Sequence, residues 1–177
     1  MRLGRLAVAA AALMALGACS SDEPAVDDSA IVSAGVAGEA EFVDDIDAAI
    51  AAVEAELGAS QRYFEITANP QLTNIFVAVD DETAVVPYLF IDGELQPPAP
   101  KQTGANGHTF AASDVDIDGG LVAERFADEL PNTAINAVSV YGDGFGATYV
   151  VAGRSEVGGL LDIVVTGDGQ IVSVDPI

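Results

Sequence analysis

The chain has 177 residues, half of them hydrophobic, and its 28 acidic and six basic residues give a formal net charge of −22. This apolar share excludes wholesale disorder, and so acidic a surface disfavours binding to nucleic acid or to anionic lipid head groups. With one cysteine and one histidine, little material exists for a disulfide framework, a zinc site or Ser-His-Asp catalysis. We therefore expect an ordinary packed core under an acidic surface, which favours solubility and leaves cationic partners open.

The first nineteen residues have the layout of a signal peptide. Arg2 and Arg5 precede an uncharged run over 6–18, which is shorter than the roughly twenty residues of a membrane-spanning helix. The sequence Leu16-Gly17-Ala18-Cys19 resembles the lipobox of bacterial lipoproteins. The resemblance implies cleavage of 1–18 and a lipid on Cys19 that anchors the protein to the bacterial cell membrane, outside the cytoplasm. The alternative, an ordinary secretory signal, would need no cysteine.

Residues 19–43 have no helical or alternating apolar period and are predicted to be a flexible tether. After them, apolar residues at helical spacing indicate a helix that Asp44 or Asp45 caps and Gly58 ends. Its apolar face consists of Ile46, Ile50, Val53 and Leu57. Short β-prone runs follow, with a hairpin turn at Asp92-Gly93. The strands are expected over 63–67, 73–79, 85–91 and 94–97, and these elements make up a first unit over 44–100.

A linker over 101–113, which contains Gly104, Asn106 and Gly107 and follows Pro98 and Pro100, separates this unit from a second one over 114–177. In the second unit, Asp118 is expected to cap a helix that Pro131 stops, with Val122, Phe126 and Leu130 on its apolar face. Strands are expected over 135–141, 147–152, 160–166 and 170–175. The order of elements thus repeats, although apolar alternation alone produces some coincidence. We predict an α+β protein of two helix-then-antiparallel-sheet repeats packed as one body.

The ends of the two units, 89–95 and 164–174, resemble the closing hairpin of the PepSY family, whose members are small extracytoplasmic helix-plus-sheet modules. In architecture, the two units are also similar to the tandem repeats of the β-lactamase-inhibitor-protein fold. Both resemblances imply non-catalytic binding or inhibition of another extracytoplasmic protein. Neither supplies a functional residue that can be carried over to this chain.

Asp114, Asp116, Asp118 and Gly119 reproduce the start of a calcium-binding loop, in which alternating carboxylates converge on one cation. The twelfth position of such a loop needs a bidentate glutamate, but here it is Arg125. The alternative is that Asp118 caps the helix and the other two acids favour its positive end. We favour capping, and we expect no metal or cofactor and no requirement for calcium.

Two further residues stand out in predicted loops. His108, the single histidine, is expected to be solvated rather than catalytic. Phe145 lies between Gly144 and Gly146 and could anchor a partner, but a buried turn residue is the favoured interpretation. The other aromatic residues are expected in the core. They include Tyr63, Phe64, Phe76, Tyr88, Phe90, Phe126 and Tyr149.

The sequence thus favours a membrane-anchored module that binds an extracytoplasmic protein or peptide, rather than an enzyme. A calcium-dependent structural surface protein is the alternative, followed by a hydrolase that uses carboxylates. Any pair chosen from 28 acids would be arbitrary, so no catalytic residue is assigned.

Overall fold

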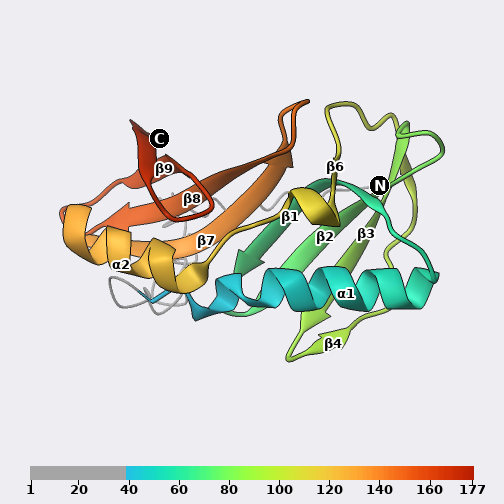
Figure 1. Ribbon diagram of the computed structural model, residues 1–177, viewed down its shortest axis with the longest axis horizontal. Coiled ribbons are helices and arrows are strands. Elements are labelled where there is room, and N and C mark those ends of the chain that lie inside the picture. The colour runs from blue at the N-terminus through green and yellow to red at the C-terminus, as the bar shows by residue number, and fades with distance from the viewer. Residues whose placement is uncertain (1–38) are drawn as a thin grey trace, which may run out of the picture. The chain divides into compact units, whose positions relative to one another are not determined.

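The computed structural model describes residues 39–177, and its first half is a helix followed by an antiparallel meander (Figure 1). A short 3-10 helix, η2 (Glu41–Val43), leads into α1 (Asp45–Leu57). The strands that follow are β1 (Arg62–Asn69), β2 (Leu72–Val79), β3 (Ala84–Ile91) and β4 (Glu94–Leu95). Helix α1 buries Ile46, Ala49, Ile50 and Val53. Its amphipathic spacing therefore places one face on the sheet, as the sequence predicts. Leu57, which was expected on this face, is 42% exposed at the end of the helix.

The second half repeats a helix-then-meander order. Strands β5 (Gln102–Thr103) and β6 (Phe110–Ala111) and the 3-10 helix η3 (Ala112–Asp114) precede α2 (Gly119–Glu129). The strands after α2 are β7 (Thr133–Gly142), β8 (Ala147–Ser155), β9 (Leu160–Val165) and β10 (Ile171–Pro176). The segment predicted to be a linker thus contributes two short strands, β5 to β3 and β6 to β1.

All ten strands of the described residues belong to one antiparallel sheet, whose main path runs β10-β9-β8-β7-β1-β2-β3-β4. The first strands after each helix, β1 and β7, pair at the centre, where Ile66 lies opposite Val140 and Thr67 opposite Ser139. Strands from 44–100 therefore fill one half of the sheet and strands from 114–177 the other. The α+β class is confirmed, and the duplication of the two units stays a prediction.

The ends of the predicted elements follow local chemistry. The Asp118 carboxylate accepts a hydrogen bond from the Leu121 N–H at 2.9 Å, so this residue caps α2 as predicted. Gly58 ends α1 in the left-handed conformation, with φ +72°. Asp92 and Gly93 both have positive φ, as a two-residue hairpin turn requires. Asp44 stands at the start of α1, but its side chain makes no capping hydrogen bond.

Both helices lie on the same face of the sheet (Figure 1), and the core fills the space between them and the strands. On β2, Ile75 and Val77 point into this core and are fully buried, whereas Asn74 and Phe76 point the other way and stay partly exposed. Neighbouring strands show the same alternation. Among the described residues no helix covers the second face, which is called the open face below.

A candidate binding surface at one end of the sheet

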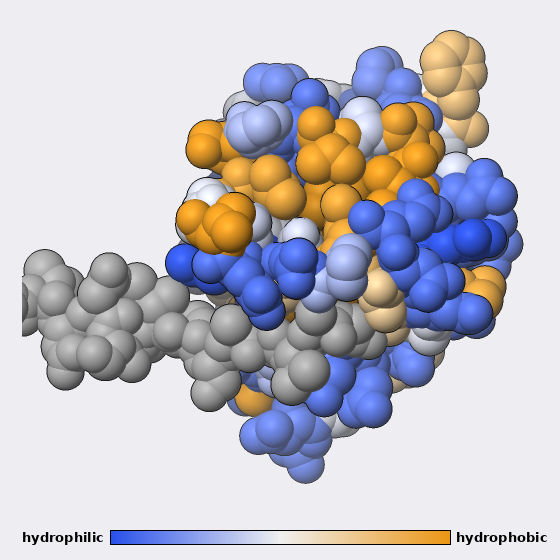
Figure 2. Space-filling view, turned by 90° about the vertical axis from the view of Figure 1, so that its left-hand side faces the viewer, coloured by the Kyte–Doolittle hydropathy of each residue, from blue (hydrophilic) through white to orange (hydrophobic). Residues whose placement is uncertain are grey.

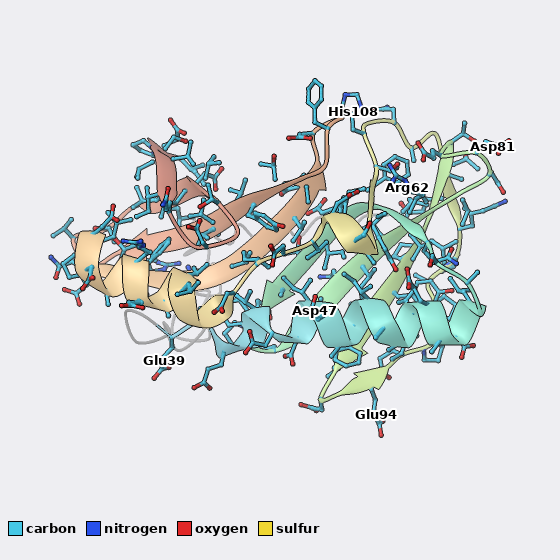
Figure 3. The ribbon with its side chains drawn as sticks, in the orientation of Figure 1. Glu39, Asp47, Arg62, Asp81, Glu94 and His108 are labelled. Atoms are coloured by element: carbon cyan, nitrogen blue, oxygen red, sulfur yellow. The ribbon has the colours of Figure 1, made fainter. Side chains whose placement is uncertain are left out.

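Three connecting segments meet at one end of the sheet and are together called the loop end. They are the β2–β3 turn (80–83), the β5–β6 loop (104–109) and the β7–β8 turn (143–146). The N–H groups of Gly104 and Ala105 donate to the Thr83 carbonyl at 3.0 and 3.1 Å, which joins the first two. An isolated β-bridge between His108 and Gly142 joins the β5–β6 loop to the β7–β8 turn. Figure 3 labels Asp81 and His108 at this end.

The β2–β3 turn has an unusual backbone. Asp80, Asp81 and Glu82 have φ values of +52°, +54° and +63°, three consecutive non-glycine residues in the left-handed region. Such a conformation costs about 1–2 kcal/mol for an ordinary L-residue, and less for aspartate. Thr83 offsets part of this conformational cost within the turn, because its N–H and hydroxyl both donate to the Asp80 carbonyl. The Lys101 ammonium pairs with the Asp80 carboxylate at 2.6 Å.

A buried threonine braces the same turn from the neighbouring loop. The Thr109 hydroxyl donates to Glu82 Oε1 at 2.7 Å and accepts from Arg62 Nε and Nη2 at 3.0 and 2.9 Å. Arg62 Nη2 also donates to the Thr109 carbonyl at 2.6 Å. Because Thr109 is only 7% exposed, these bonds are shielded from competing water on the Thr109 side, although the Arg62 and Glu82 side chains are each 47% exposed. They connect residues that are 20 or more positions apart in the sequence.

The β7–β8 turn is fixed by its own aspartate. Asp143 Oδ1 accepts hydrogen bonds from the N–H groups of Phe145 and Gly146 at 2.7 and 2.8 Å, and Oδ2 accepts from the Thr148 hydroxyl at 3.1 Å. These donors stabilise the carboxylate and hold the pKa of Asp143 below its ordinary value, the Phe145 N–H most of all. The turn is therefore preorganised by bonds within five residues.

Phe145 projects from this turn into solvent, and its side chain is fully exposed, at 101% of the reference area. The expectation that Phe145 is a buried turn residue is therefore wrong. Gly144 takes φ +90°, and the two N–H bonds to Asp143 curl the turn back on itself. Both effects turn the intervening phenyl ring away from the sheet.

His108 is exposed, as the sequence predicts, and lies against the β7–β8 turn. A Cβ added to Gly144 would come within 3.2 Å of the imidazole atoms Cε1 and Nδ1. The histidine ring thus packs against the glycine that precedes Phe145. A side chain at position 144 would force the ring or the turn to move.

The aspartates of the calcium-like segment are engaged in separate contacts. Asp118 caps α2, while Asp114 Oδ2 accepts a hydrogen bond from the Ala111 N–H at 2.8 Å. The Asp116 N–H donates to the Tyr149 hydroxyl at 2.8 Å. Over residues 39–177, no group of three carboxylate, histidine or cysteine side chains is placed to hold a metal ion. The capping role of Asp118 is confirmed, and the independence from calcium stays a prediction.

Exposed apolar residues also gather around β10, including Leu160, Val172, Val174 and Ile177. Figure 2 shows apolar side chains on the side of the molecule that carries this half. The pairing of β10 with β9 is interrupted by a bulge that lies between Ile171 and Ser173 of β10, and Pro176 has no N–H to donate. Both features limit the addition of a further strand to this edge.

The lipidation site predicted at Cys19 lies outside the described residues. Within 39–177, no helix is long and apolar enough to cross a membrane. No family model matches the chain, and no curated protein matches it. The resemblance to the PepSY family therefore stays a prediction.

One solved structure shares the fold. It is the crystal structure of CD1622, a candidate lipoprotein of Clostridium difficile 630, which is 13% identical and superposes with a TM-score of 0.54. The match covers 78% of this chain and 94% of that one. At this identity the similarity establishes the arrangement of helices and strands, and it carries no functional residue from one protein to the other.

Proposed function

We propose that this protein is a membrane-anchored extracytoplasmic lipoprotein whose folded part binds a protein or peptide through the loop end, without catalysis. The lipobox-like sequence that ends at Cys19 supports the anchor, and a neighbour in fold that is itself described as a candidate lipoprotein is consistent with it. The observation that carries the binding role is Phe145, a fully exposed aromatic ring on a rigid turn.

An exposed phenylalanine can contribute binding free energy when a partner covers it. Burying such a side chain contributes about 1.5–3 kcal/mol, and aromatic anchors in pockets are frequent hot spots of interfaces. Because Asp143 already holds the turn, little conformational entropy is lost when Phe145 enters a pocket. This arrangement favours recognition over catalysis.

The charges at the loop end indicate the kind of partner. Asp80, Asp81 and Glu82 stand on the β2–β3 turn at the same end of the sheet. Lys101 pairs with Asp80 and Arg62 with Glu82, so Asp81 is the acid of this turn that belongs to neither pair. An acidic group at the same end of the sheet as an apolar anchor favours a partner that carries basic residues beside its pocket. The formal net charge of −22 acts in the same direction over longer range.

Site-specific photo-crosslinking in cells that express the full chain tests this proposal. A benzophenone amino acid replaces Phe145 in one variant and Val157 in the other, since Val157 is a second apolar turn residue with 94% exposure. We expect a discrete adduct from position 145 and none of that mass from position 157. Failure to form an adduct at 145, or identical adducts from both positions, would exclude the loop end as the binding surface.

The anchor is tested in the same cells with Cys19→Ser. We expect this variant to leave the lipid-modified membrane fraction and accumulate as an unprocessed precursor or in the soluble fraction, because no thiol remains to carry lipid. If the variant were processed and bound to the membrane like the wild type, the anchor would have been assigned wrongly.

A further inference from the structure

The open face carries a carboxylate between two aromatic side chains. Glu65 on β1 pairs with Tyr141 on β7 and with Phe76 on β2. Directly paired residues of antiparallel strands point to the same face of a sheet. The adjacent residues Ile66 and Ile75 are fully buried under the helices, so these three side chains all stand on the open face.

The spacing of the three side chains suits a cation. Neighbouring strands lie about 4.8 Å apart, so Tyr141 and Phe76 start about 10 Å from each other with Glu65 midway. A positive group above the Glu65 carboxylate would therefore lie within about 6 Å of both rings, the range of cation–π attraction. Tyr141 is 38% exposed, and Glu65 and Phe76 are partly exposed.

The carboxylate is also held in position. The Thr67 hydroxyl donates to Glu65 Oε1 at 2.8 Å, and the Ser139 hydroxyl lies 2.9 Å from that of Thr67. Because the single Thr67 proton is used on Glu65, Ser139 donates to Thr67. The two ion pairs formed by the described residues involve Arg62 with Glu82 and Lys101 with Asp80. Glu65 is thus oriented by hydroxyl groups and belongs to neither pair.

We propose that Glu65, Tyr141 and Phe76 form a subsite for an arginine side chain of a peptide or protein partner. A guanidinium combines a charge for the carboxylate with flat faces for the rings, and it is more weakly hydrated than an ammonium. The acidity of the whole chain, at −22, favours a basic partner. This inference deepens the proposed binding function, and it rests on that function for the identity of the partner as a peptide or protein.

The test is a titration of the isotopically labelled full chain with acetyl-Gly-Arg-Gly-amide, followed by NMR shifts of the backbone amides. We expect saturable shifts around Glu65, Thr67 and Tyr141, with a dissociation constant on the order of 1 mM, as one small subsite allows. The citrulline peptide, which has the same shape without the charge, is expected to bind at least about tenfold more weakly. A lysine peptide should lie between the two.

Matched variants separate the local site from the general acidity. Glu65→Gln keeps an oxygen that accepts from Thr67, and it is expected to weaken binding of the arginine peptide at least about tenfold. Glu94→Gln removes the same charge from the exposed strand β4 and is expected to change the affinity less than twofold. Tyr141→Leu should weaken binding about two- to fivefold, whereas Tyr141→Phe should leave it unchanged.

Equal effects of Glu65→Gln and Glu94→Gln, or equal binding of the citrulline peptide, would overturn the proposal, as would the absence of saturable shifts up to about 10 mM peptide. The same titration with Phe145→Ser is expected to match the wild type, because Phe145 lies on the loop end. Failure of the arginine subsite is therefore distinguishable from failure of the loop end as a binding surface.

Discussion

Two of the three segments of the loop end, the β2–β3 turn and the β7–β8 turn, are held in shape in different ways. The β2–β3 turn uses three acidic residues in the left-handed region, and it is braced by Thr109, Arg62 and Lys101 from elsewhere in the chain. The β7–β8 turn places its positive φ on Gly144 and is braced by Asp143 within the turn itself. One turn presents charge, and the other presents an apolar ring.

This difference indicates what each turn depends on. Strain in the β2–β3 turn persists because contacts with distant residues fix both of its ends. This turn should therefore be destabilised when one of those distant residues is changed. The β7–β8 turn has little backbone strain, and its conformation should respond to substitutions at its own positions. Substitutions that break one brace at a time can test this contrast.

The largest effect is expected from Thr109→Val, which keeps the shape of the side chain and removes its hydroxyl. Glu82 and Arg62 then lose the group that joins them in a nearly buried position. We expect the free energy of unfolding to fall by about 2 kcal/mol and the melting temperature by about 4–8 °C. Thermal unfolding of the full chain, followed by circular dichroism, measures the change.

Thr103→Val is the matched control, because Thr103 lies exposed on β5, directly before the β5–β6 loop of the loop end. Its effect should stay within about 0.5 kcal/mol. If the two variants unfolded at the same temperature, the acidic turn would not depend on the brace from Thr109.

A smaller effect is expected from Gly144→Ala in the other turn. The added methyl group would meet the His108 ring at 3.2 Å, and the turn would hold the alanine at φ +90°. We therefore expect the free energy of unfolding to fall by about 1–2 kcal/mol. Gly146→Ala is the control, since its Cβ would meet nothing within 4 Å and its φ is not in the left-handed region. Urea unfolding of both variants should separate them by at least about 1 kcal/mol, and equal midpoints would contradict the role of Gly144.

Most of the elements could be predicted because their signals are local. The spacing of Ile46, Ile50 and Val53 determines the buried face of α1, and Asp118 caps α2 through a bond to the first turn of that helix. The dipeptide Asp92-Gly93 takes the positive φ values that a two-residue hairpin turn requires. Such features depend on residues only a few positions apart.

The features of the binding surfaces depend on contacts between distant residues. Phe145 was expected to be buried on the basis of its residue type, but its exposure follows from how the turn folds back onto Asp143. Phe76 was expected in the core, and its partial exposure depends on which face of the sheet the helices cover. The pairing of β1 with β7 brings Glu65 beside Tyr141, 76 positions away. No local pattern in the sequence contains that information.

The smallest expected effect, and the most local, concerns the ionisation of Asp143. Its pKa lies below the ordinary value of 3.8 because the N–H groups of Phe145 and Gly146 stabilise the carboxylate in the folded protein. A depressed pKa means that this stabilisation is fully present above the unfolded pKa and is lost as the pH falls through the folded pKa. The amide signals of Phe145 and Gly146, followed by NMR between about pH 2 and pH 7, should therefore titrate with a midpoint below 3.8. In Asp143→Asn, whose amide oxygen still accepts but does not ionise, the same signals should stay constant apart from small effects of more distant acids. A midpoint at or above 3.8 would show that the carboxylate does not hold the turn, and Phe145 would then have to be fixed by its partner.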